Sequence, residues 1–223
     1  MTEHEPLQPL TKSQRVLHEE ATATYEEGMT PQAARYLLDR GISQETAMAA
    51  RLGVVTDPLP GHERMRGFLS IPYLDRHGAP LSVRFRCLEQ HDHREHFHGK
   101  YMSLPEEPPR LYNIGAIFAA EETIAVTEGE FDALILNQIG IPAVGAPGAK
   151  MWRPHHRRML AGFGKVWVFG DPDEAGAEFS HTVTRSIRQA HAIRLRLGDV
   201  TDTYLQGGED AIYELIEERE QYQ

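Results

Sequence analysis

The sequence predicts an α/β fold in which a parallel sheet is flanked by helices and preceded by a smaller α+β subdomain. Two short apolar runs, 124–126 and 166–169, do not alternate with polar residues, a pattern typical of parallel strands that are covered on both faces. Segments with helical patterning separate these runs, and alternating strands and helices favour a parallel sheet. The organisation changes before residue 119, where short strands follow a group of helices.

In the N-terminal half, the pattern predicts an amphipathic helix over 13–27, with Val16, Leu17, Ala21 and Tyr25 as core contacts. Two short capped helices follow. The segments FLSIPYL and LSVRFRCL, joined by the turn DRHGAP, then predict a β-hairpin.

The C-terminal half alternates strands and helices up to an acidic final helix. We expect strands at 124–126, around Val144, at 166–169 and at 193–195, and helices at 116–122, 130–138, 153–161, 174–190 and 209–219. The expected domain boundaries are a disordered tail at 1–12, the α+β subdomain at 13–118, the α/β domain at 119–205 and the acidic helix at 206–223.

Composition and charge limit the function classes. The chain has 223 residues, 40% of them hydrophobic, with a net charge of −10 and one cysteine, so it can bury a core but cannot form an internal disulfide or a multi-cysteine zinc ribbon. We find no apolar run that could span a bilayer, and we expect a cytoplasmic protein, in the host cytoplasm if a phage encodes it. Residues 199–223 hold eight acids and one base, whereas 62–112 hold eight bases and seven acids, so one face can be locally basic.

Four carboxylates stand where two of the buried strands end. Glu128, Asp171 and Asp173 directly follow the strands, and Asp132 lies one helical turn after Glu128. Ligands of open parallel sheets bind beyond the carboxyl ends of the strands. Acids that converge there need cations, and hard oxygen ligands favour Mg²⁺ or Mn²⁺. The sequence therefore predicts a metal site that acts on phosphates.

These residues resemble the Toprim domain, whose signature is a Glu-Gly pair after one strand and an Asp-x-Asp after another. Here the signature stands as Glu128-Gly129 and Asp171-Pro172-Asp173. The resemblance covers about residues 121–205 and implies a Rossmann-like parallel sheet. It also implies catalysis by Glu128, Asp171 and Asp173. Asp199, in LRLGDVTD, matches the late acidic motif of the family and becomes a further metal ligand, with Asp202 behind it.

The N-terminal half is similar to the corresponding part of the DnaG-type primase catalytic core, through the strings YLLDRGIS, MRGFLSIPYLDRHGAPLSVRFRCL and GKYMSLPEEPPRLYNI. This similarity covers about residues 30–205. It implies that a set of basic and aromatic residues holds template and nucleotide phosphates: Arg66, Arg84, Arg86, Lys100, Tyr101 and Arg110.

By this resemblance we expect a DNA primase catalytic core, a nucleotidyltransferase that synthesises short RNA primers from ribonucleoside triphosphates on single-stranded DNA. Two Mg²⁺ or Mn²⁺ ions, held by Glu128, Asp132, Asp171, Asp173, Asp199 and Asp202, would support the reaction. Glu128 has two roles open to it, metal ligand or general base. We expect a minimal core that depends on a separate zinc-module or helicase polypeptide.

Two other functions remain open. A Toprim nuclease would use the same carboxylates and metals to cut a strand, and a replication adaptor would keep the fold without catalysis. The glycine-rich GAPGAK is too short for a nucleotide-binding phosphate loop.

The histidine-rich run HDHREHFHG, with His91, His93, His96 and His98, invites a zinc site. We interpret it instead as a mobile, pH-sensitive surface loop, since no cysteine or second ligand pair accompanies it. We place Cys87 separately, as a buried core thiol.

Overall fold

The computed structural model describes residues 7–105 and 107–221. The chain divides into two compact units, which are Met1–Asp39 with Ser43–Pro108, and Arg40–Ile42 with Pro109–Gln223. Part of the predicted disordered tail, residues 1–6, lies outside the described residues. Residues 7–11 of the predicted tail precede the first helix, and the side chain of Thr11 caps that helix. Within the described ranges, every helix is too short or too polar to cross a membrane.

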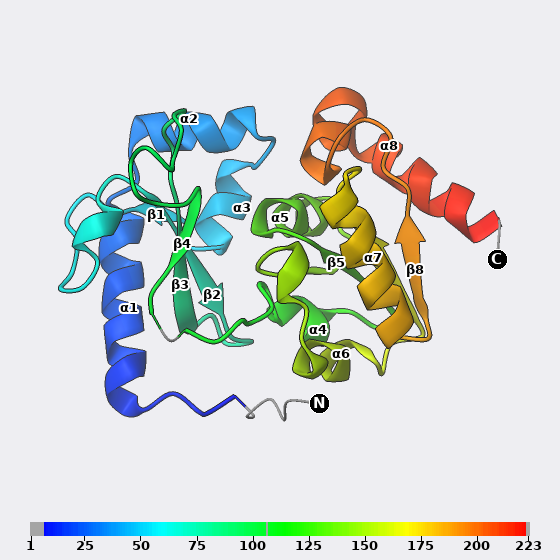
Figure 1. Ribbon diagram of the computed structural model, residues 1–223, viewed down its shortest axis with the longest axis horizontal. Helices are drawn as coiled ribbons and strands as arrows, with labels where there is room; N and C mark the ends of the chain where they lie inside the picture. The colour runs from blue at the N-terminus through cyan, green and yellow to red at the C-terminus, as the bar shows by residue number, and fades with distance from the viewer. Residues whose placement is uncertain (1–6, 106, 222–223) are drawn as a thin grey trace. The chain divides into compact units, whose positions relative to one another are not determined.

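The first unit contains an antiparallel sheet with the strand order β1-β2-β3-β4 (Figure 1). Its strands are β1 (Gly53–Val54), β2 (Leu69–Leu74), β3 (Pro80–Arg86) and β4 (Tyr101–Ser103). Its helices are α1 (Lys12–Glu27), α2 (Pro31–Asp39), α3 (Gln44–Ala49) and the 3₁₀ turn η1 (Glu63–Met65). The predicted hairpin is confirmed as β2 and β3, which pair from Leu69 opposite Arg86 to Leu74 opposite Pro80.

Helix α1 packs against β1, β2 and β3. Ala21 and Tyr25 are buried in this contact, as predicted. Val16 and Leu17, predicted as core residues, are instead 64% and 58% exposed. The buried face of α1 also includes His18 and Thr22. Because these two residues are polar, the pattern of apolar residues does not identify this face as the buried one.

The second unit contains a parallel sheet with the strand order β6-β5-β7-β8. Its strands are β5 (Thr123–Thr127), β6 (Ala143–Gly145), β7 (Lys165–Phe169) and β8 (Ala190–Ile193). Its helices are α4 (Gly115–Ala119), α5 (Glu130–Gln138), the 3₁₀ turn η2 (Ala149–Met151), α6 (Pro154–Leu160), α7 (Glu174–Ser186) and α8 (Val200–Gln221). The predicted α/β fold, a flanked parallel sheet preceded by an α+β part, is confirmed.

Alternate side chains of the central strands point to opposite faces of the parallel sheet. Ile124 and Val126 of β5, with Val166 and Val168 of β7, form one core with residues of α4, α6 and α7. Helix α5 packs on β5, β6 and α8. Because the last four residues of β5 and of β7 are buried, the carboxyl ends of these strands are fixed points from which loop residues project.

Two predicted elements of this unit need correction. Strand β8 ends at Ile193, where the prediction placed its start. Helix α8 joins two helical segments at Gly208, whose φ of 69° is not helical. The segment after Gly208 corresponds to the predicted final helix, and the segment from Val200 to Gly208 is a helix that was not predicted. The start at Val200 places Asp199 directly before the helix and Asp202 in its first turn.

Candidate active site

The predicted acids Glu128 and Asp171 lie at the carboxyl ends of adjacent strands. β5 and β7 pair in parallel, with Thr127 opposite Phe169, so both chains leave the sheet at the same edge. Gly170 makes the turn out of β7 possible, because a Cβ there would meet the carbonyl oxygen of Gly176 at 2.4 Å. The sequence spacing thus brings the two motifs to one place.

Four of the six predicted metal ligands are oriented by backbone N–H groups. The pairs are Asp171 N–H to Glu128 Oε1 at 2.8 Å, Thr201 N–H to Asp132 Oδ1 at 3.1 Å, Gly176 N–H to Asp173 Oδ1 at 2.8 Å and Asp202 N–H to Asp199 Oδ1 at 2.7 Å. Each bond engages one oxygen of its carboxylate. The second oxygen of Glu128, Asp132 and Asp173 remains for a ligand, whereas that of Asp199 faces Arg40.

Asp132 is the most deeply buried of these acids, with 8% of its surface exposed. It lies in the first turn of α5. Its Oδ1 also accepts a hydrogen bond from the hydroxyl of Thr201, at 2.9 Å. Thr201 lies in the first turn of α8, so its two hydrogen bonds to Asp132 connect the first turn of α5 to the first turn of α8. The sequence analysis missed Thr201, although its place between Asp199 and Asp202 was a signal.

The pKa values show that the acids share one electrostatic environment. Burial raises the pKa of Glu128 to about 7, and the charges of Asp171 and Asp173 add to this rise. Burial also raises the pKa of Asp132 to about 7, with Asp199 the next cause. The pKa of Asp171 rises to about 6 through burial and then through Asp199, Asp173 and Asp202. Negative potential therefore accumulates at this edge of the sheet.

The donor set suits a hard divalent cation. All six side chains offer carboxylate oxygens, without sulfur or imidazole, which favours Mg²⁺ or Mn²⁺. The raised pKa values of Glu128, Asp132 and Asp171 also favour cation binding, because a cation between the acids would reduce their mutual repulsion. Within residues 7–105 and 107–221, however, these oxygens do not form a group compact enough to hold an ion as they stand, so binding would require small side-chain movements.

Arg40 is a second residue that sequence analysis did not single out. Its guanidinium Nη2 lies 3.8 Å from Asp199 Oδ2, and both residues belong to the second unit. The Nε atom of Arg40 is buried and has no hydrogen-bond partner among the described residues. Arg40 lies in the string YLLDRGIS, which carries part of the resemblance to the primase core.

The predicted phosphate-binding residues lie mainly in the first unit. Arg84 and Arg86 project from one side of β3, and their guanidinium carbons lie 4.6 and 4.9 Å from the ring centre of Tyr101. Arg86 is only 5% exposed and also faces the ring of Tyr36 at 5.6 Å, which favours a supporting position.

The other predicted phosphate-binding residues are more accessible. Arg66 and Lys100 are exposed, and Arg66 donates to the carbonyl of Thr56 at 2.5 Å. Arg110 is half-buried and belongs to the second unit.

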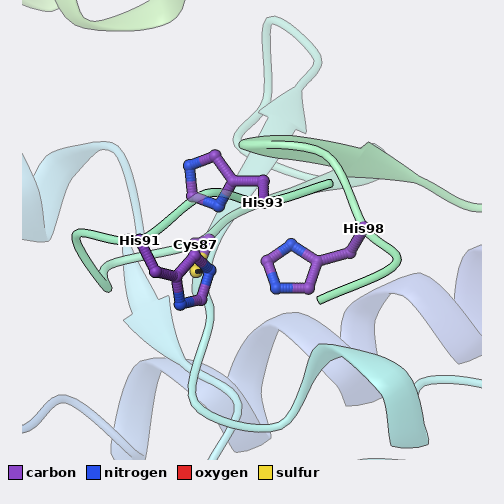
Figure 2. A group of neighbouring side chains, drawn as sticks. All are labelled: Cys87, His91, His93 and His98. Atoms are coloured by element: carbon purple, nitrogen blue, oxygen red, sulfur yellow. Dashed lines mark hydrogen bonds between the residues drawn. The ribbon is translucent and has the colours of Figure 1, made fainter. Parts of the chain in front are cut away.

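The interpretation of the histidine-rich run needs correction. It assumed that no cysteine accompanies the histidines, but one ligand atom each of Cys87, His91, His93 and His98 lie within 4.8 Å of one another (Figure 2). Cys87 is buried, as predicted. Its Sγ nevertheless lies 3.7 Å from Nε2 of His91, so the thiol and the loop form one cluster.

Comparison with known proteins finds a similar phage protein. The chain is 38% identical to the Gene 57 protein of Mycobacterium phage D29 over 156 residues, which are 68% of this chain and 99% of that protein. No family model matches the chain.

Two solved structures show the same fold. One is the Aquifex aeolicus primase, zinc-binding and RNA polymerase domains, with a TM-score of 0.77 and 19% identity over 96% of this chain and 63% of that one. The other is the DnaG primase catalytic domain bound to single-stranded DNA, with a TM-score of 0.73 and 20% identity over 92% of this chain and 78% of that one. The chain belongs to the same family as the phage Gene 57 protein and has the fold of the DnaG-type primase catalytic core.

Proposed function

We propose that this protein is the catalytic core of a metal-dependent DNA primase, which joins ribonucleoside triphosphates into short RNA primers on a single-stranded DNA template. The observation that carries the proposal is the convergence of Glu128 and Asp171 at one sheet edge, with Asp132, Asp173, Asp199 and Asp202 in the same electrostatic environment. A structure with the same fold is described as bound to single-stranded DNA, which supports a DNA template here.

In this reaction the 3′-oxygen of the primer forms a bond to the α-phosphorus of the incoming nucleotide. The bond from that phosphorus to the bridging oxygen breaks, and pyrophosphate leaves with the electron pair. Catalysis of phosphoryl transfer depends mainly on positioning and charge stabilisation. The protein therefore has to hold the two reacting groups in line and accept the proton of the 3′-hydroxyl.

Asp171, Asp173 and Asp199 are the residues that would hold Mg²⁺ or Mn²⁺, with Asp132 and Asp202 behind them. Bound ions would supply positive charge to the reacting phosphate oxygens. The backbone N–H groups that orient Asp173 and Asp199 keep these carboxylates in place before substrate binds.

Glu128 is suited to receive the proton of the 3′-hydroxyl. A general base works best when its pKa is near the operating pH. Burial raises the pKa of Glu128 to about 7 in the metal-free protein, and bound cations would lower it from there. Its Oε1 accepts from Asp171 N–H, so Oε2 would take the proton. Metal ligation by Glu128 is the alternative role.

The predicted phosphate contacts lie in both units. Arg66, Arg84 and Lys100 would bind the template or nucleotide phosphates, and Tyr101 would offer a face on which a base can stack. A separate zinc-module or helicase polypeptide is the partner we propose for choosing the start site or loading the protein.

The decisive experiment incubates the purified chain with single-stranded DNA, labelled ribonucleotides and Mg²⁺ or Mn²⁺. We expect short RNA products that require template and metal and that disappear in Asp171→Ala, while circular dichroism shows that the variant stays folded. Synthesis that survives in the variant would refute the site. Metal-dependent degradation of the DNA without synthesis would identify a nuclease, and DNA binding without metal dependence would favour an adaptor.

A further inference from the structure

The segment between β3 and β4 is folded back on itself. Its base is closed by a hydrogen bond from the N–H of Cys87 to the carbonyl of Lys100, at 2.9 Å. Within the segment, the N–H of His98 donates to the carbonyl of His93 at 3.1 Å. Two tighter turns are closed by hydrogen bonds from Glu95 N–H to the carbonyl of Asp92 and from Phe97 N–H to the carbonyl of Arg94. This folding brings histidines that are two to seven residues apart next to the end of β3.

The cluster has the ligand count of a closed zinc site, and its ligand atoms lie within 4.8 Å of one another. The thiol of Cys87 and the rings of His91, His93 and His98 gather around a common space (Figure 2). The distance of 3.7 Å from Cys87 Sγ to His91 Nε2 is close to the roughly 3.5 Å expected between sulfur and nitrogen ligands of tetrahedral zinc. Among the residues that the structure describes, no other group of histidine, cysteine or acidic side chains is compact enough to hold an ion.

The hydrogen bonds of the ring nitrogens also fit metal ligation. Nδ1 of His98 lies 3.0 Å from the carbonyl oxygen of Gly99, to which it can donate, so Nε2 is left for a ligand. A carbonyl that receives the other ring N–H is the usual support of a metal-bound histidine.

His93 has a ring nitrogen that an ion could engage. Its Nδ1 is buried and makes no hydrogen bond to any residue in 7–105 or 107–221. A buried polar atom without a partner is costly and rare in folded proteins. A metal ion would satisfy this nitrogen.

The crowding of imidazole rings points the same way. His96 stacks on His91 with ring centres 4.1 Å apart, and the centres of His91 and His98 are 5.0 Å apart. Rings this close repel when protonated.

We propose that Cys87, His91, His93 and His98 form a tetrahedral Zn²⁺ site that fastens the segment 88–100 to the end of β3. One thiolate and three imidazoles are ligands that zinc prefers, and Mg²⁺ or Mn²⁺ does not. All four positions are filled by protein, so the site is structural and separate from the predicted carboxylate centre.

The first test measures zinc in the full chain, purified without a histidine tag, after equilibration with Zn²⁺ and removal of the excess. We expect about one zinc per chain. Cys87→Ser and His93→Ala should each weaken Zn²⁺ binding at least tenfold. His96→Ala removes a neighbouring ring outside the four ligands and should keep the metal, and Asp171→Asn should keep it too. The proposal would be overturned if the wild-type chain bound no zinc. It would also be overturned if Asp171→Asn lost the zinc while Cys87→Ser kept it.

A second test reports the ligand set and does not depend on activity. Co²⁺ added to the metal-free chain should give visible bands typical of tetrahedral coordination and a near-ultraviolet thiolate charge-transfer band. Cys87→Ser should lose the charge-transfer band. If that variant fails to fold by circular dichroism, His98→Ala on the surface segment tests the same site and should lose the tetrahedral bands. Bands of octahedral Co²⁺ in the wild-type chain would contradict the site.

Discussion

The Oε1 atom of Glu128 accepts a hydrogen bond from the backbone N–H of Asp171, over 2.8 Å. The two residues are 43 positions apart, but they follow adjacent parallel strands whose register brings their ends together. The carboxylate of one motif therefore holds the backbone of the other. This bond gives Glu128 a structural role that can be separated from its chemical one.

Substitution of Glu128 should separate these roles. Glu128→Gln keeps an oxygen that can accept from Asp171 N–H but cannot take a proton, so we expect primer synthesis to fall about 10²- to 10⁴-fold with no loss of stability. Glu128→Ala also leaves the N–H unpaired and should cost a further ~1–2 kcal/mol of unfolding free energy. Primer assays and urea denaturation measure the two effects. Full activity in Glu128→Gln would show that the side chain acts only through structure.

Neutralising Asp171 should stabilise the metal-free protein while it abolishes synthesis. The raised pKa of Asp171, caused by burial and by the neighbouring acids, shows that its charge is costly in the folded state. Asp171→Asn removes this charge, and we expect about 1–3 kcal/mol of added stability in chelator at pH 8.

Magnesium provides the control for this prediction. Mg²⁺ should raise the melting temperature of the wild-type chain more than that of Asp171→Asn, because ligands that bind the native state stabilise it. Glu178→Gln, an exposed position on α7, should respond to Mg²⁺ like the wild type. Equal shifts in the wild type and Asp171→Asn would argue against metal binding at Asp171.

The parts of the fold that sequence analysis predicted well are those in which one pattern dominates. The strands before Glu128 and Asp171 are buried on both faces, so their apolar runs are unbroken, and α5 has the predicted bounds Glu130–Gln138. Because a strand end fixes where the next residue lies, both acidic motifs could be placed before the structure was known. The roles of these acids stay predictions until the assays are made.

The misplaced features depend on tertiary contacts. Val16 and Leu17 are apolar but exposed, while His18 and Thr22 of the same helix are buried against the sheet, and periodicity alone cannot choose between these stripes. The pattern places Cys87 at the end of a strand, but its thiol lies beside His91 of the segment that follows directly. Such contacts depend on how the loop folds back. The spacing of the residues in the sequence does not determine that conformation.

The basic residues of the first unit should contribute to template binding through charge. Arg84 is half-buried against the ring of Tyr101, and Lys100 is exposed. We expect Arg84→Gln and Lys100→Gln each to weaken binding of single-stranded DNA about equally for all sequences. Each should also reduce the slope of log affinity against log salt by about 0.7 to 1.

Fluorescence anisotropy at several salt concentrations measures this slope. Arg35→Gln is the matched control, since Arg35 is an exposed arginine of α2 that pairs with Asp39 at 2.8 Å. It should bind DNA like the wild type. Unchanged slopes in Arg84→Gln and Lys100→Gln would remove these residues from the proposed interface.

His156 should make the second unit sensitive to acid. It is fully buried in α6, its Nε2 lies 3.0 Å from the carbonyl of Pro109, and its Nδ1 accepts from Arg153 N–H at 3.2 Å. Burial lowers its pKa from 6.5 to about 4, so the unfolded chain takes up the proton first, and stability falls as pH drops from 6.5 to 4 by about 2–3 kcal/mol. The raised pKa values of the acids act in the opposite direction, but equally in wild type and variant. We therefore expect His156→Gln to lose less unfolding free energy than the wild type between pH 7 and 4.5, measured by urea denaturation. His181→Gln, at an exposed position, is the control and should follow the wild type. If the unfolding free energies of His156→Gln and the wild type fall in parallel with pH, His156 is not the source of the acid sensitivity.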